Sequence, residues 1–180
     1  MSAPHFILAI DPGTTESQFV VWDRIAEQVF EHGFQRNDVL LANIGTLCDY
    51  THATVIEGVA SYGMAVGKEV FETCIWIGRY YQRCADLGKE PTLLYRLAVK
   101  THLCHSAKAK DANIRQALID RYGHPGTKKA PGKLYGISSH AWAALALAVT
   151  FSETTINHTE LKSAQHQDLT RGGLARSDTP

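Results

Sequence analysis

Long hydrophobic runs are missing from this chain of 180 residues. No apolar run approaches the roughly 20 residues that a membrane-spanning helix requires. The first residues, Met1–His5, show no basic segment followed by an apolar one, as a secretory leader would. These absences favour a soluble protein of the cytoplasm.

An excess of one charge is also missing, because 18 Lys and Arg side chains balance 18 Asp and Glu side chains. The net charge therefore does not indicate a nucleic-acid partner, and local clusters have to be inspected instead. The four cysteines form no C-x-x-C pair, which argues against a structural zinc site. We expect reduced thiols, with Cys48, Cys74 and Cys104 in the core.

Hydrophobic residues make up 44% of the sequence, enough for one domain with an ordinary core. We expect this domain to occupy residues 1–155. The sequence then becomes polar, and we expect residues 156–180 to form a tail.

The first predicted strand is the apolar run Phe6–Ile10, which ends at Asp11 and a Pro-Gly-Thr-Thr turn. Such a run is typical of a central strand that is buried on both faces. Ser17–Asp23 and Glu27–Phe34 are rich in β-branched and aromatic residues, so they complete an antiparallel meander.

Helices and strands alternate in the rest of the chain. We expect these segments: a helix Asn37–Tyr50 with Asn37 as N-cap, a strand Ala53–Gly58, a helix Val66–Leu87, a strand in Thr92–Leu103, a helix Ala112–Tyr122 opened by Asp111, a mobile basic loop His124–Gly136, and a helix His140–Phe151 capped by Ser138 or Ser139. The order predicts an α/β fold with a mixed sheet and helices on both faces.

Two acids end two predicted strands, Asp11 and Glu57. If the strands are parallel neighbours, both carboxylates lie at the same edge of the sheet, where they repel each other and need a cation. Mg²⁺ prefers such oxygen ligands, and a pair of ions can promote phosphodiester cleavage. Alternatively, each acid accepts hydrogen bonds from loop N–H groups.

Basic residues gather in the second half of the chain, between predicted elements. They are Lys100, Lys108, Lys110, Lys128, Lys129 and Lys133. Cations on loops and near helix starts suit phosphate binding, although such lysines are also ordinary solvated surface. His140, in the first turn of the last helix, is either a ligand or a capping or core residue.

These segments together resemble the RuvC family of Holliday-junction endonucleases, over roughly Phe6–Thr150. The matching motifs are I-L-A-I-D-P-G-T-T, V-I-E-G-V and S-A-K-A-K-D. The resemblance implies an RNase H-like sheet of five strands, three antiparallel and then parallel, with Asp11 and Glu57 as metal ligands. Lys100 and Lys110 match the basic region of the family.

The last motif departs from the family, because Ala143 stands where the resemblance implies an aspartate. A phage or prophage subgroup that uses His140 and a relocated acid, Asp111, is one explanation. An introduced substitution at Ala143 is the second, and loss of cleavage with retained junction binding is the third. Sugar-kinase and actin-like ATPases share the D-P-G-T-T turn, but they need a second such domain.

The resemblance implies an endonuclease that cuts Holliday junctions or related branched DNA with Mg²⁺, or alternatively Mn²⁺. Asp11, Glu57, Asp111 and His140 would be its catalytic and metal-binding residues. It also implies a homodimer, formed through the helix predicted at 66–87 or at 37–50, and a wedge residue in the loop after Glu57. Ala60 stands near the position of the wedge, and Tyr62 is a weaker candidate for this role. The alternative is a non-catalytic protein of the same fold that binds branched DNA.

Overall fold

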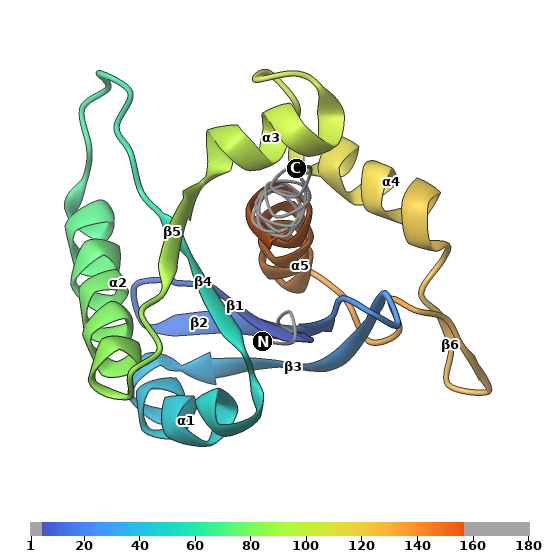
Figure 1. The fold of residues 1–180 in the computed structure, drawn as a ribbon. Coiled ribbons are helices and arrows are strands. Elements are labelled where there is room, and N and C mark those ends of the chain that lie inside the picture. The colour runs from blue at the N-terminus through green and yellow to red at the C-terminus, as the bar shows by residue number, and fades with distance from the viewer. Residues whose placement is uncertain (1–4, 157–180) are drawn as a thin grey trace, which may run out of the picture.

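The computed structural model describes residues 5–156, so the predicted tail lies almost entirely outside the described residues. Figure 1 shows the elements, in this order: β1 (Phe6–Asp11), β2 (Glu16–Asp23), β3 (Gln28–Arg36), α1 (Asn37–Tyr50), β4 (Ala53–Gly58), α2 (Lys68–Asp86), β5 (Thr92–Tyr95), α3 (Arg96–Cys104), α4 (Asp111–Tyr122), β6 (Gly126–Thr127), β7 (Ala130–Pro131), α5 (Ala141–Phe151) and the π-helix η1 (Ser152–Ile156).

Five strands form the central sheet in the order β3-β2-β1-β4-β5. β1 pairs antiparallel with β2 and parallel with β4, and β5 is parallel to β4. This arrangement confirms the predicted mixed sheet of antiparallel strands followed by parallel ones. Because β1 and β4 run the same way, their carboxyl ends meet at one edge.

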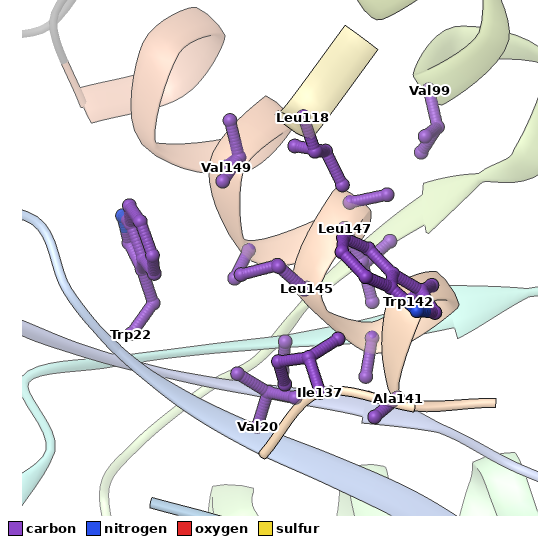
Figure 2. Close-up of a cluster of buried hydrophobic side chains, with 14 of the residues drawn as sticks. Val20, Trp22, Val99, Leu118, Ile137, Ala141, Trp142, Leu145, Leu147 and Val149 are labelled. Atoms are coloured by element: carbon purple, nitrogen blue, oxygen red, sulfur yellow. The ribbon is translucent and has the colours of Figure 1, made fainter. Parts of the chain in front are cut away.

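Helices cover both faces of the sheet (Figure 1). On one face α5 packs against β1 and β2, and α3 and α4 pack against α5. Figure 2 shows the core of this layer, where Val20 and Trp22 from the sheet meet Leu145 of α5. α5 has almost only apolar residues because it is enclosed between the sheet and the outer helices.

The opposite face is covered by α1 and α2. Alternate residues of β1 explain how one strand serves both layers: Ile7 and Ala9 face α5, whereas Leu8 and Ile10 face α1 and α2. Within residues 5–156, none of the helices combines the length and apolar character that a membrane crossing requires.

The predicted strand in Thr92–Leu103 is wrong beyond Tyr95. The pairing partner β4 ends at Gly58, opposite Tyr95, so the edge strand has no further neighbour. From Arg96 the chain is the helix α3, which buries Val99 and Leu103 at helical spacing. Lys100 therefore lies on a helix rather than at the end of a strand.

The predicted helix caps are also corrected. Asn37 and Asp111 are the first residues of their helices, and the N-cap of α5 is His140 rather than a serine. The segment predicted as a mobile loop contains the small β6–β7 hairpin, which places Lys128 and Lys129 in its turn.

One face of α2 is exposed although its residues are apolar. Phe71, Cys74, Ile75 and Gly78 follow the helical spacing, and all four are accessible. The side chains of Phe71 and Ile75 are 61% and 62% exposed. The prediction of a core position is therefore wrong for Cys74, whereas Cys48 is buried and all four cysteines are free.

Candidate active site

Asp11 and Glu57 lie side by side at the carboxyl ends of β1 and β4. Ile10 is paired with Ile56, so the parallel register brings the next residues of the two strands to the same edge. A side-chain hydrogen bond joins the two carboxyl groups, and it raises the pKa of Glu57 and lowers that of Asp11, as expected when the shared proton is on Glu57. The structure thus brings together the acids that the strand ends predicted.

Burial determines the protonation of this pair. Desolvation disfavours the charged forms and raises the pKa of both carboxyl groups. The neighbouring Asp11 and its hydrogen bond add to the effect at Glu57, whose pKa rises to about 8. Near neutral pH the pair keeps this proton, and a bound cation would allow both carboxyl groups to ionise. Their oxygen atoms suit a hard divalent ion such as Mg²⁺.

Asp111 and His140 line the same pocket as the acid pair. Asp111 is the first residue of α4, and His140 is the N-cap of α5. Ala143, one turn into α5, also lines this pocket. Asp111, the relocated acid predicted from the sequence, therefore lines the same pocket as Ala143, where the resemblance to RuvC implies an aspartate.

Arg96 is the residue that the sequence analysis missed. Its Nη1 lies 3.6 Å from Oε1 of Glu57, and its Nη2 pairs with Asp111. The guanidinium is largely covered, and its charge opposes the rise in the pKa of Asp11 and Glu57. Arg96 reaches the pocket because α3 begins directly after the edge strand β5.

The four predicted residues share this pocket without forming a ready-made ligand set. Among the described residues, no three His, Cys, Asp or Glu side chains are close enough together to hold a metal ion. Asp111 points to the Arg96 guanidinium instead, so a positive charge already lies between Glu57 and Asp111. The oxygen donors suit a divalent ion, but Asp111 can serve as a ligand only if it leaves Arg96.

A buried hydrogen-bond network fixes the turn that follows Asp11. Asn37 Nδ2 donates to the Gly13 carbonyl (3.0 Å), and Ser17 Oγ donates to Asn37 Oδ1 (2.6 Å). The hydroxyl of Tyr80, from α2, donates to the same Asn37 oxygen (3.1 Å). A side chain at Gly13 would lie 2.3 Å from the Glu16 carbonyl, so the turn requires glycine. Both helices α1 and α2 therefore hold the turn that orients Asp11.

Two aromatic side chains border the acids. The ring of Phe34, on β3, is stacked on His140 with 6.1 Å between centroids and 13° between planes. Tyr62, in the loop between β4 and α2, lines a hollow with Asp11 and Glu57 and is 60% exposed. The wedge candidate thus lies beside the acid pair.

The predicted lysines lie outside the acid pocket, whose lining within the described chain includes only one cation, Arg96. Lys108 and Lys110 are exposed in the connection before α4, and Lys100 is half-buried on α3. Lys133 pairs with Glu27, 3.1 Å away. None of these lysines therefore lines the pocket: Lys110 directly precedes Asp111, whereas Lys133 lies beside Val29, at the end of β3 opposite to Phe34.

Solved structures share this architecture. The structure of RuvC from Thermus thermophilus aligns with a TM-score of 0.63 and 16% identity, over 84% of this chain and 97% of that chain. T. thermophilus RuvC in complex with a Holliday junction substrate gives a TM-score of 0.63 and 18% identity, over 82% and 93%. This chain has the RuvC fold.

The match to RuvC extends over nearly the whole described chain, and it confirms the RNase H-like fold class that the motifs implied. No protein-family model and no curated protein matches the chain by sequence. The likeness to RuvC is therefore one of three-dimensional structure.

Proposed function

We propose that this protein is a divalent-metal-dependent endonuclease that cuts Holliday junctions or related branched DNA. One observation carries the proposal: in a RuvC fold, Asp11 and Glu57 form a proton-sharing pair at the adjacent ends of β1 and β4, and Asp111 and His140 lie in the same pocket. The resulting reaction would be hydrolysis of a phosphodiester bond.

Asp11 and Glu57 would hold the ion, Mg²⁺ or alternatively Mn²⁺, through their carboxylate oxygens. When bound, such an ion would stabilise negative charge on the phosphate and lower the pKa of a water molecule that it holds. Asp111 would complete the site after it parts from Arg96. His140, exposed at the edge of the pocket, would orient the attacking water and accept its proton.

Branched DNA as the substrate is supported by the T. thermophilus RuvC complex, which contains a Holliday junction substrate. In this chain, Lys100, Lys108 and Lys110 would contact phosphates on one side of the pocket. The β6–β7 hairpin, with Lys128 and Lys129 in its turn, would guide a DNA arm together with Lys133. Phosphate contacts of this kind make the affinity fall steeply with salt.

A homodimer is part of the proposal, because a four-way junction has two strands to cut and a two-fold related pair of sites matches it. The exposed apolar face of α2 is the contact we propose. Phe71 and Ile75 supply apolar area there, and Gly78 has open space where a Cβ would be, so a second helix can approach closely.

The test is cleavage of a synthetic four-way junction with labelled strands, in Mg²⁺, in Mn²⁺ and in EDTA. We expect nicking in either metal, none in EDTA, and none by Asp11→Asn, which removes a metal-binding charge but keeps the size of the side chain. A linear duplex of the same sequence is the control for structure selectivity.

A second function is favoured by a specific observation, the Ala143 side chain in the acid pocket and the absence, within residues 5–156, of three clustered metal-ligating side chains. Under this alternative the protein binds branched DNA without cutting it. Tight junction binding by the wild type and by Asp11→Asn, with no nicking by either in metal, would support the alternative and contradict the nuclease.

A further inference from the structure

We propose that Phe34 and His140 form an aromatic shelf on which a base next to the cleaved phosphate stacks. The inference rests on the proposed function, because it names how the same site would hold the DNA strand. The shelf is defined by the Phe34 ring on β3 and the His140 ring at the start of α5.

The geometry of the shelf comes from two elements that are far apart in the sequence. Phe34 is near the end of the edge strand β3, opposite Gln18 of β2, and its ring extends towards the start of α5. The Phe34 and His140 planes differ by only 13°, so the two rings present nearly parallel faces. Both side chains are exposed, and Phe34 is 55% exposed.

The shelf borders the acid site directly. A hollow next to Asp11 is lined by the turn after this residue, by Phe34 and by His140. A phosphate held near Asp11 would therefore place one of its flanking nucleosides over this hollow. Base stacking on an aromatic ring suits an enzyme that recognises DNA shape, because every base has a π-face.

A DNA strand, rather than a protein segment, is the occupant that the surroundings favour. The main chain of β3 is joined to the basic segment after β7, because the Val29 N–H donates to the Lys133 carbonyl (2.9 Å). The strand β3 therefore extends from the region of the lysine hairpin to the acid pocket, with Phe34 at the pocket end. A DNA backbone that lies along β3 would pass the lysines of the hairpin first and would then reach the shelf beside Asp11.

Phe30 provides a matched control on the same strand. Its side chain is also 55% exposed, but it packs on Phe6, with 4.6 Å between ring centroids, away from the acid pocket. Substitution of either phenylalanine by leucine removes an exposed ring and keeps an apolar side chain. We expect only the change at Phe34 to lower the affinity for the DNA junction.

The experiment uses the full chain with Asp11→Asn, which prevents cutting, and four-way junctions that carry 5-iododeoxyuridine at successive positions. This analogue crosslinks under long-wavelength light to an aromatic ring on which it stacks. We expect one position to give a crosslink that mass spectrometry places on Phe34, and we expect Phe34→Leu to abolish it. Junction affinity should fall about tenfold in Phe34→Leu, since stacking on one ring has an effect of this order.

Phe34→Trp should retain the affinity, and Phe30→Leu should bind as the wild type does. The inference is overturned if Phe34→Leu binds the junction like the wild type and no analogue position crosslinks to Phe34. It is also overturned if, with Asp11 intact, Phe34→Leu slows nicking without lowering junction affinity and no analogue position crosslinks to Phe34, because the ring would then only position His140. Either result leaves metal-dependent nicking by the wild type intact, so failure of the shelf is distinguishable from failure of the nuclease.

Discussion

Nη1 of Arg96 lies 3.6 Å from Oε1 of Glu57, in the acid pocket that both residues line. The other guanidinium nitrogen pairs with Asp111, so one cation joins two of the proposed metal ligands. A buried or partly buried positive charge repels a divalent ion more strongly than a solvated one does. Arg96 therefore competes with the metal for the acids.

Substitution Arg96→Gln should strengthen metal binding by the DNA-free protein. Removal of one positive charge a few ångströms from the ligands should lower the Kd for Mn²⁺ by about tenfold. The measurement is titration of free Mn²⁺ by electron paramagnetic resonance. Arg79→Gln is the control, because Arg79 lies over Trp76 on α2, with its guanidinium carbon 4.3 Å from the ring centroid. Unchanged or weaker Mn²⁺ binding in Arg96→Gln would contradict the competition.

The stability of the metal-free protein should depend on the protonation of Glu57. Its pKa is about 8 in the folded protein, against 4.5 ordinarily, so the folded state holds a proton that the unfolded state releases. The stabilisation is complete below pH 4.5 and is lost as the pH rises through about 8.

We therefore expect the Tm of the wild type in EDTA to fall more steeply than that of Glu57→Gln between about pH 5 and about pH 9. Glu72→Gln, a change in an exposed ion pair of α2, is the control and should follow the wild type. Added Mg²⁺ should raise the Tm of the wild type at the alkaline end. Parallel curves for the wild type and Glu57→Gln would mean that the acid pair does not hold this proton.

We expect Asp111 to take the place of the aspartate that the resemblance to RuvC implies at position 143. Asp111→Asn should reduce nicking of a junction by at least about tenfold, the scale on which metal-site partners act. Ala143→Asp should restore activity in the Asp111→Asn background and change little in the wild type, because Ala143 lines the same pocket. An unchanged rate in Asp111→Asn, or a large gain from Ala143→Asp alone, would show that Asp111 is not the substitute.

The exposed face of α2 should hold the dimer together. Phe71→Glu combined with Ile75→Glu places two like charges where apolar side chains would meet, so we expect a monomer by size-exclusion chromatography with light scattering. Both side chains are more than 60% exposed, so the Tm should change little if the protein is otherwise intact. Arg83→Glu, at an exposed α2 position off this face, should remain dimeric. A monomeric wild type would contradict the interface.

The sheet could be predicted because its strands have strong local patterns. Phe6–Asp11 is uniformly apolar up to the acid, and burial on both faces is the physical cause. The sequence left the parallel pairing of β1 with β4 as a condition, and the structure meets this condition and brings Asp11 next to Glu57.

Arg96 could not be found in this way, because its position depends on where the edge strand β5 ends. Leu93, Leu94 and Leu97 give the same apolar density in a strand as in a helix, and only the lost pairing partner after Tyr95 separates the two. The exposure of the apolar face of α2 could not be predicted for a related reason. Apolar periodicity gives the face of a helix but not whether another element covers it.

The central claim, metal-dependent cleavage of branched DNA by the Asp11–Glu57 site, is tested most directly with a supercoiled plasmid that extrudes a cruciform. The wild type in Mg²⁺ or Mn²⁺ should convert it to linear product, since two related sites cut opposite strands of the junction, and Asp11→Asn should give none. Intact plasmid after incubation with the wild type, or equal linear product from Asp11→Asn, would contradict the account.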